Sequence, residues 1–346
     1  MTCLSRVNCS RSLSVTKMVL ALLAILVSLS FCAPCFSQSN QAREEPKPQK
    51  IFIDTDIGSD IDDAFAVGLA LESPEFKILG ISSASGDTTL RARLLSRLLQ
   101  DTGRADIPVA VGIPKPDVKH GAGLSQAPYA DGGPSDVSYP SAVDFLLDQI
   151  RKNPGEVTLI AIGPLTNIGA AIDKDAVTFR KLKRAVIMGG SVYRGYDSGR
   201  YGATSPPSAE YNIAVDPPAA QKLFTSGVPL FVMPLDSTQI KFEEVRRAQL
   251  VSAGTPVTDA ITVMYLPMVP GRSGTPTLFD PVAVAYAIRP DLCPTQFLHL
   301  RVDEKGFTRV ESGEPNAQVC LHSDAERFLD LLMSRLVGAQ AKETHP

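Results

Sequence analysis

Residues 51–64 read IFIDTDIGSDIDDA, a short apolar run followed by a cluster of aspartates. The first three residues are typical of a buried strand, and a helical pattern of apolar residues begins at Asp62. The turn between them carries five carboxylates within ten residues: Asp54, Asp56, Asp60, Asp62 and Asp63. Like charges this close repel, so a folded protein keeps them only where solvent or a bound cation offsets the repulsion. The stretch therefore predicts a strand-to-helix turn with a candidate metal site.

The residue types in this turn favour a hard cation. Gly58 permits a sharp turn, which lets carboxylates from both sides converge. Ligands that are all oxygen suit Ca²⁺ or Mg²⁺. Asp62 and Asp63 have an alternative role, because negative charge in the first turn of a helix is favourable by itself. That alternative does not account for Asp54 and Asp56, which precede the helix.

The rest of the chain continues the alternation of short apolar runs and helical patterns. The expected strands are 51–54, 78–82, 109–113, 157–162, 185–188 and 230–233. The expected helices are 62–71, 90–100, 142–152, 167–172, 217–224, 281–288 and 325–336. This alternation predicts an α/β fold with an open, mostly parallel sheet flanked by helices, similar to a Rossmann core. Ligands of such sheets bind at the carboxyl ends of the strands.

Composition limits the partners of the protein. Of 346 residues, 44% are hydrophobic, which suffices for a sizeable core. The formal net charge is −3 and the chain has no Trp, so neither a basic surface nor a stacking platform for nucleic acid is expected. We expect a small-molecule ligand and no nucleic-acid partner.

The first fifty residues have the layout of an export signal. A basic lead with Arg6, Arg11 and Lys17 precedes an apolar run over 18–31, and small or polar residues follow. We predict a signal peptide over 1–37, a disordered linker over 38–49 and a single catalytic domain over 50–340. The protein would be periplasmic or secreted, with no membrane contact after cleavage; an uncleaved signal anchor is the alternative.

Two cysteines and two long loops leave open alternatives. Four of the six cysteines lie in the leader, so Cys293 and Cys320 remain, either as a disulfide or as two separate buried thiols. The segments 114–140 and 193–207 are rich in Gly, Pro and Ser. We predict that at least one of them is a substrate lid, against the alternative of simple surface variation.

Six segments carry a family resemblance. The strand and the acidic turn over 54–63 are followed by 160–167 (IAIGPLTN), 188–190 (MGG), 209–217 (AEYNIAVDP), 235–238 (LDST) and 279–281 (FDP). In this order, and over nearly all of the chain after the leader, they resemble the motifs of the inosine-uridine preferring nucleoside hydrolases. The resemblance implies an N-ribosyl hydrolase that is dependent on Ca²⁺ and cleaves ribonucleosides, and it implies a homodimer or homotetramer.

The resemblance also implies roles for individual residues. Asp56 would be a metal ligand and the general base that activates water. Asp63, Asp280 and the main-chain carbonyl of Ile162 would complete the protein ligands of the metal. The ribose would be held by Asp62, Asp87, Glu210 and Asn212. Taken alone, Asp280 has an ordinary alternative as the N-cap of a helix with Pro at its first position.

This sequence departs from the family pattern at two places. Two extra residues separate Gly58 from the Asp62–Asp63 pair, so Asp60 is an alternative for a ligand or ribose role. Phe279 stands where the family has a His that protonates the leaving base, and Phe cannot do this. His120, in the first long loop, is a candidate acid, with a solvent-exposed loop histidine as the alternative. A tyrosine of the second loop (Tyr193, Tyr196 or Tyr201) is a candidate for holding the base.

Three alternative functions remain at this point. One is a hydrolase of another N-ribosyl compound, and another is a non-catalytic, calcium-dependent ribonucleoside-binding protein, which the loss of the histidine at Phe279 favours. The third is a phosphatase with Asp54 as its nucleophile, which leaves Gly58 and the later aspartates without a role.

Overall fold

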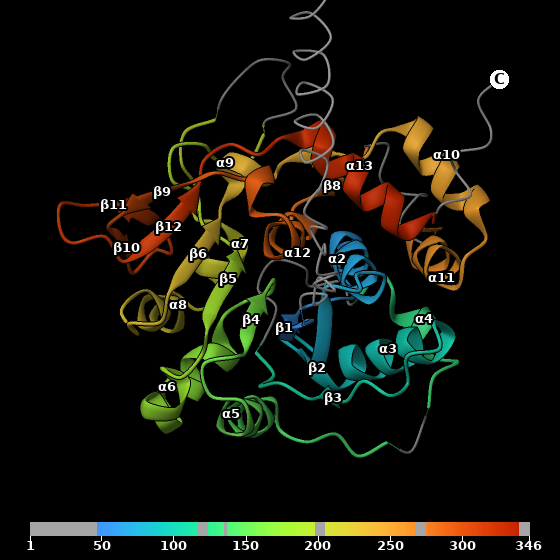
Figure 1. Cartoon of the computed structure of the whole chain (residues 1–346), viewed down its shortest axis with the longest axis horizontal. Coiled ribbons are helices and arrows are strands. Elements are labelled where there is room, and N and C mark those ends of the chain that lie inside the picture. Colours follow the sequence, from blue (N-terminus) through green and yellow to red (C-terminus); the bar gives the residue numbers. More distant parts are fainter. Residues whose placement is uncertain (1–46, 116–123, 135–136, 198–204, 267–274, 339–346) are drawn as a thin grey trace, which may run out of the picture. The chain divides into compact units, whose positions relative to one another are not determined.

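An eight-stranded sheet forms the centre of the fold (Figure 1). The computed structural model describes residues 47–115, 124–134, 137–197, 205–266 and 275–338. Across the sheet the strand order is β3-β2-β1-β4-β5-β6-β12-β9. The strands are β1 (Gln49–Thr55), β2 (Phe76–Ser83), β3 (Val109–Ala110), β4 (Thr158–Ala161), β5 (Arg184–Met188), β6 (Leu230–Met233), β9 (Thr295–Leu298) and β12 (Ala317–Cys320). All neighbours pair in parallel except β9, which runs antiparallel to β12.

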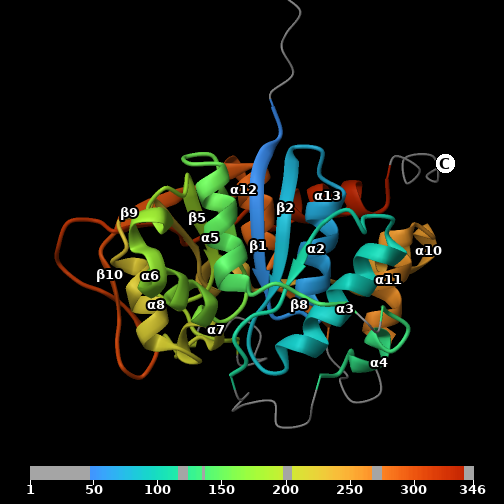
Figure 2. The same cartoon turned by 90° about the horizontal axis from the view of Figure 1, so that it is seen from below.

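Helices cover both faces of this sheet (Figures 1 and 2). One core holds side chains of α2 (Asp62–Leu71), α3 (Thr88–Asp101), α10 (Glu244–Ala253), α11 (Pro256–Tyr265), α12 (Pro281–Ile288) and α13 (Ala325–Leu336). The other core holds side chains of α5 (Ala142–Lys152), α6 (Thr166–Phe179) and α8 (Pro217–Phe224). Strand β1 supplies both cores, because Ile51 and Ile53 pack on the first face and Phe52 on the second. A strand buried on both faces explains the continuous apolar run at the start of the domain.

The sheet topology places a ligand site between β1 and β4. From β1 the chain builds β2 and β3 on one side, and it then returns to place β4 on the other side of β1. The two turns that follow β1 and β4 therefore diverge at the carboxyl edge of the sheet, where open α/β sheets bind ligands. The first turn carries the acidic cluster, and the second carries the GPLTN segment.

The predicted α/β class is confirmed, and the predicted elements all occur. Strand β3 is shorter than predicted, because Val111 forms only an isolated bridge with Ser141. Helix α6 is longer than predicted: it continues beyond Ile172 to Phe179 across a break at Asp175, whose φ is −157°. Several elements of the C-terminal third were not predicted, including α10, α11, β9, β12 and the hairpin of β10 (Leu300–Val302) and β11 (Thr308–Val310).

Smaller elements lie in the connections between the main helices and strands. These are α4 (Ala127–Ala130), α7 (Tyr211–Ala214), α9 (Leu235–Thr238), η2 (Pro290–Leu292) and the short pair of β7 (Ile240–Lys241) and β8 (Thr277–Leu278). Helix α4 lies within the first long loop, whose residues 116–123 and 135–136 are outside the described ranges. The lid interpretation of the two long loops stays a prediction.

The predicted leader and most of the predicted linker lie outside the described residues, which begin at Lys47. From Lys47 onward the chain forms one compact unit by its internal contacts. Strand β1 begins at Gln49, one residue before the predicted domain boundary. Within the described ranges, no helix is long and apolar enough to cross a membrane. Cys293 and Cys320 form a disulfide with Cα atoms 5.6 Å apart, which decides between the two alternatives for this pair.

Candidate active site

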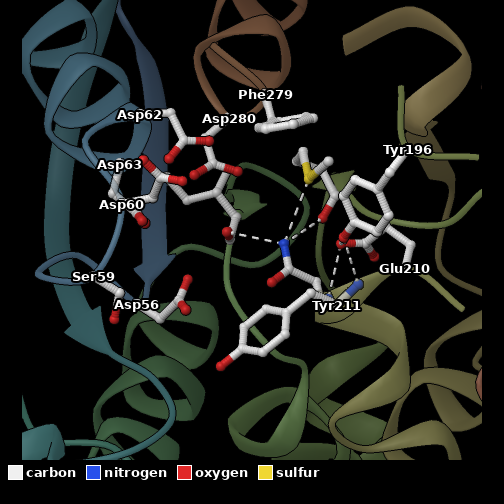
Figure 3. A pocket seen from close by; sticks show the side chains of 13 residues that line it. Asp56, Ser59, Asp60, Asp62, Asp63, Tyr196, Glu210, Tyr211, Phe279 and Asp280 are labelled. Carbon is white, nitrogen blue, oxygen red and sulfur yellow. Dashed lines mark hydrogen bonds between the residues drawn. The ribbon is translucent and has the colours of Figure 1, made fainter. Parts of the chain in front are cut away.

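A cavity of about 270 Å³ opens at the carboxyl edge of the sheet, next to the ends of β1, β4 and β5 (Figure 3). It is lined by Asp56, Ser59, Asp60, Asp62, Asp63, Ile162, Met188, Tyr196, Glu210, Tyr211, Asn212, Phe279 and Asp280. Eight of the residues singled out for metal or substrate in the sequence line it: Asp56, Asp60, Asp62, Asp63, Ile162, Glu210, Asn212 and Asp280. Phe279, at the position of the missing histidine, lines it as well.

One end of the cavity is acidic. Asp62, Asp63 and Asp280 each offer a carboxylate oxygen, and these oxygens lie within 4.8 Å of one another. All three residues are buried, with at most 4% of their surface exposed. Figure 3 shows the three carboxylates grouped together and the Asp56 carboxylate directed into the same cavity. Residues more than 200 positions apart in the sequence thus form one acidic cluster, because the N-terminus of α12 lies against α2.

The electrostatics of this end favour a bound cation. Burial raises the pKa of Asp62, Asp63 and Asp280 well above the usual value of 3.8, and the neighbouring carboxylates raise each one further. Buried carboxylates that are held together against repulsion indicate a site whose positive partner is a bound ion. The donors are all oxygen atoms, which fits a hard divalent cation. The residues therefore fit a metal site.

The helix-end alternatives for the aspartates hold in position only: Asp62 and Asp63 stand in the first turn of α2, and Asp280 precedes α12. Asp280 occupies the N-cap of α12, yet its side chain forms no capping hydrogen bond. Its carboxylate faces Asp62 and Asp63 instead. Helix α2 begins after Ile61, and it also lacks a side-chain cap. Thr55 Oγ1 donates a hydrogen bond to Asp63 Oδ1, which fixes one carboxylate oxygen at the end of β1.

The turn after β4 lies directly against the turn after β1. The Ile162 N–H donates to the Asp54 carbonyl at 2.8 Å, so the two strands stay paired to the edge of the cavity. A Cβ atom on Gly163 would lie 2.8 Å from the Asp56 nitrogen and 3.0 Å from its carboxylate. Only glycine permits this approach. Ile162 consequently lines the cavity beside Asp56.

Polar residues of α7 form the floor of the cavity. Asn212 Nδ2 donates to the Ile162 and Met188 carbonyls, at 3.1 Å in each case, and thereby joins the ends of β4 and β5. Glu210 is the N-cap of α7, and it accepts hydrogen bonds from the main-chain N–H groups of Asn212, Ile213 and Gly190 at 2.9–3.2 Å. Both side chains are almost fully buried. They line the cavity and also hold its walls together.

The other end of the cavity is aromatic. Tyr196 and Phe279 meet edge to face, with ring centroids 6.2 Å apart and planes at 78°. The Tyr196 hydroxyl accepts a hydrogen bond from the Tyr211 N–H at 3.0 Å and lies 3.5 Å from Glu210 Oε1. Burial raises the pKa of Tyr196, so its hydroxyl stays protonated at neutral pH. Of the three candidate tyrosines, Tyr196 lines the cavity, Tyr193 is 58% exposed, and Tyr201 lies outside the described residues.

Some candidates lie elsewhere. Asp87 is exposed and caps α3 through a hydrogen bond from the Leu90 N–H at 2.9 Å, so the structure does not bring it to the cavity. The capping pattern at the start of α3 could have indicated this role. Asp54 is fully buried and accepts hydrogen bonds from Ser82 and Asn167, and burial raises its pKa to about 7. A nucleophile cannot act from there, which removes the phosphatase alternative. His120 lies outside the described residues.

Ser59, Met188 and Tyr211 also line the cavity, although the sequence motifs did not single them out as cavity residues. Met188 was assigned only to a strand and to the MGG turn, and Tyr211 only to the segment around Glu210. Ser59 falls in the two-residue extension of the acidic turn, where the sequence alone does not show which side chain faces inward.

Comparisons with known proteins identify the family of the chain. A sequence profile described as inosine-uridine preferring nucleoside hydrolase matches residues 51–330. The chain therefore belongs to this family of metal-dependent enzymes that act on ribonucleosides, and it is a nucleoside hydrolase.

Two relatives illustrate the match in sequence. The probable uridine nucleosidase 2 of Oryza sativa subsp. japonica is 37% identical over 59% of this chain and 62% of that protein, which is less than two thirds of its length. The pyrimidine-specific ribonucleoside hydrolase RihA of Citrobacter koseri is 33% identical over 83% of this chain and 97% of that protein.

Solved structures share the fold. A plant nucleoside hydrolase is 28% identical, with a TM-score of 0.72 over 84% of this chain and 99% of that chain. A purine-preferring ribonucleoside hydrolase from Gardnerella vaginalis is 27% identical, with a TM-score of 0.69 over 84% and 98% of the two chains. The predicted family and fold are thus confirmed.

Proposed function

We propose that this protein is a calcium-dependent hydrolase of ribonucleosides that releases ribose and the free base, with Asp56 as the general base. The observation that carries the proposal is the buried cluster of Asp62, Asp63 and Asp280 beside Asp56 in one cavity. A cluster of this charge suits a divalent cation, and the cavity beside it has room for a sugar.

The ligands of the cation would be the carboxylates of Asp56, Asp63 and Asp280 and the Ile162 carbonyl, and all four residues line the cavity. Ca²⁺ accepts such a mixture of carboxylate and carbonyl oxygens, with the remaining positions left for water and hydroxyl groups. Asp62 would then accept a hydrogen bond from a ribose hydroxyl. When bound, the cation acts as a Lewis acid that makes water a better nucleophile near neutral pH.

The residues of the chain supply the rest of the chemistry. Asp56 takes a proton from the attacking water as the new bond to the anomeric carbon forms. The bond between this carbon and the base nitrogen breaks, and its electron pair leaves with the base. The ribose carries positive charge during this step, and the surrounding carboxylates stabilise that charge from fixed positions. Asn212 and Glu210 keep the ends of β4 and β5 in place beneath the sugar.

The departing base needs a proton, and the described residues that line the cavity include no histidine to supply it. Phe279 and Tyr196 line the cavity as a pair of neighbouring rings, so the base would lie against these rings (Figure 3). Stacking and apolar contact favour binding of a planar base. We propose that the leaving base takes its proton from solvent at this open end.

We also propose export to an oxidising compartment, periplasmic or extracellular. The leader layout motivates this proposal, and the disulfide between Cys293 and Cys320 supports it, because disulfides persist mainly outside the cytosol. A homodimer or homotetramer is the proposed assembly by family resemblance. Light scattering on the purified mature protein measures the assembly, and N-terminal sequencing of the exported protein tests cleavage after Ser37.

Ribose release tests the proposed reaction. Mature protein with calcium is incubated with inosine, adenosine, guanosine, uridine and cytidine, and reducing sugar is measured before and after removal of the metal by a chelator. We expect ribose from at least one nucleoside, loss of activity after chelation, and recovery on adding calcium. Full activity in the metal-free protein would overturn the metal dependence. Calcium binding without ribose from any nucleoside would favour another N-ribosyl substrate or a binding protein.

A further inference from the structure

The acidic turn is held by an arginine that lies outside the cavity lining. Arg91 of α3 is fully buried, the largest side chain among the completely buried ones. Its guanidinium reaches under the turn after β1: Nη1 donates to the Asp56 and Ile57 carbonyls, the latter at 2.9 Å. Nη2 donates to Ser59 Oγ at 2.9 Å. Several N–H groups of the rigid, planar guanidinium thus donate hydrogen bonds to one short loop.

A second anchor holds the continuation of the same loop. The Gln126 N–H donates to the Gly58 carbonyl at 3.0 Å, and its Nε2 donates to the Asp60 carbonyl at 2.6 Å. Ser125 Oγ donates to the Ser59 carbonyl at 2.7 Å. Together with the bonds from Arg91, these contacts satisfy the carbonyl groups of five successive residues, 56–60. The two extra residues of this turn are therefore fixed by contacts from outside it.

The charge of Arg91 has a particular arrangement. Within the described residues, Arg91 forms no ion pair with a carboxylate, and its donors all go to main-chain carbonyls and one hydroxyl. A buried charge is costly without compensation, and here the compensation comes from the acidic cluster beyond the loop.

The strand-to-helix turn after β2 is shaped for the same contact. Ser85 adopts a φ of 61°, and it is the only residue other than glycine with positive φ in the described chain. Its carbonyl accepts the Arg91 Nε–H at 3.0 Å. Such backbone strain persists only where the surrounding structure enforces it. Gly58 has a φ of 122°, and a Cβ there would lie 3.6 Å from Arg91 Nη1.

We propose that Arg91 is a positioning residue, which with Gln126 orders residues 56–60 so that the carboxylates of the turn face the cavity before a metal binds. The inference rests on the proposed function of this site and adds the device that assembles it. In a charged cluster without such anchors, repulsion would drive the aspartates apart in the metal-free protein. Preorganisation of this kind raises metal affinity, because the ordering is complete before binding.

The test compares Arg91→Met with Arg91→Lys and with a control, Arg184→Met. Arg184 is a half-buried arginine that also bonds a main-chain carbonyl, but it lies at the start of β5, at the amino edge of the sheet. Hydrogen–deuterium exchange of the 56–61 segment is measured without metal, and the calcium Kd is measured by calorimetry without nucleoside. Steady-state kcat and KM are then measured with calcium.

For Arg91→Met we expect exchange of the 56–61 segment to be at least about 10-fold faster, calcium binding about 10-fold weaker, and kcat lowered more than KM is raised. Arg91→Lys should recover part of each effect, because one ammonium reaches fewer carbonyls. Arg184→Met should change the melting temperature but not the calcium Kd. Should Arg91→Met fold poorly, Gln126→Leu tests the second anchor, with about 3-fold weaker calcium binding expected.

The inference would be overturned if Arg91→Met left both the exchange of the 56–61 segment and the calcium Kd unchanged. The same criterion applies to Gln126→Leu if Arg91→Met does not fold. The exchange measurement needs neither activity nor metal. A wild-type protein that releases no ribose would therefore count against the proposed function alone, while faster exchange in the variant would still support the positioning role.

Discussion

The two ends of the cavity are built in different ways. At the acidic end, Asp56, Asp60, Asp62 and Asp63 come from one turn, and only Asp280 comes from a distant segment. At the aromatic end, Tyr196, Tyr211 and Phe279 come from three separate segments, and the hydroxyl of Tyr196 bonds to the main chain of Tyr211 (Figure 3). The acidic end concentrates charges of one sign in a small volume. The aromatic end combines apolar rings with the Tyr196 hydroxyl, which bonds to the protein.

This difference predicts that the two ends have different roles in the reaction. Clustered negative charge is stabilised by a cation and by a positively charged transition state, so the acidic end should govern kcat and metal binding. Aromatic rings offer shape and contact area, so the aromatic end should govern KM and base preference. Substitutions at each end test whether the two ends have these separate roles.

The largest effect is expected at Asp56. Asp56→Asn removes the proposed general base but keeps the size of the side chain, and we expect kcat to fall by about 10³-fold while nucleoside binding largely survives. Ribose release and equilibrium binding measure the two quantities. Asp60→Asn is the matched control, because Asp60 lines the same cavity but its Oδ1 accepts a hydrogen bond from the adjacent Ile61 N–H. A larger loss in Asp60→Asn than in Asp56→Asn would transfer the base role to Asp60.

The next effect concerns calcium and pH. A carboxyl whose pKa is higher in the folded than in the unfolded protein stabilises the fold when protonated, and this contribution is lost as pH rises through the folded pKa. The raised pKa values of Asp62, Asp63 and Asp280, and that of Asp54 at about 7, therefore make the metal-free protein lose stability from about pH 4 upward. Calcium binds the ionised form, so its stabilising effect should grow over the same range.

Melting temperatures at pH 5 and pH 8, with and without calcium, measure this linkage. At a calcium concentration about 100 times the Kd, the gain is about 2.7 kcal/mol, on the order of 5 °C in Tm. Asp280→Asn should remove most of this gain, whereas Asp173→Asn, on the surface beside Lys222, should keep it. A calcium effect that is equal at both pH values would contradict the linkage between the carboxylates and the metal.

At the aromatic end, Phe279→His places a candidate acid where the family has its histidine. We expect the rate on purine nucleosides to rise by about 10-fold and the pH profile to gain a limb near the ordinary histidine pKa. Phe279→Leu is the control, because it changes the shape of the wall without adding a proton donor. If Phe279→His leaves the profile unchanged, the leaving base does not depend on an acid at this position.

The smallest effect is expected for Tyr196→Phe. This change keeps the edge-to-face contact with Phe279 but removes the hydroxyl that bonds to the Tyr211 N–H. The loss of one such hydrogen bond weakens binding by about 2- to 5-fold, and we expect this change in KM rather than in kcat. Steady-state kinetics with the best nucleoside measures it. A fall in kcat of more than about 100-fold would instead indicate that the Tyr196 hydroxyl donates a proton to the base. The aromatic end would then also govern kcat.

Strands β1 to β6, most of the helices that cover them and the acidic turn could be predicted from the sequence, whereas β9, β12, α10 and α11 could not. Strand β1 is buried on both faces, so its apolar run and the following aspartates are visible without any tertiary information. The family motifs also follow the chain order, and they are enough to predict that Ile162, Glu210, Asn212 and Asp280 belong to the site. The resemblance supplied these residues, and most of the motifs meet because they follow strands whose carboxyl ends lie at one edge of the sheet.

The contacts that hold the site residues in place are visible in the tertiary structure and not in the sequence. Asp280 could have been a cap, and the structure turns it towards Asp62 and Asp63 because α12 lies against α2. Asp87 could have held the sugar, and it caps α3 instead. Arg91 looks in the sequence like any surface arginine of a helix, yet it is fully buried under the acidic turn. Burial and contact across distant segments depend on packing, which a single sequence does not display.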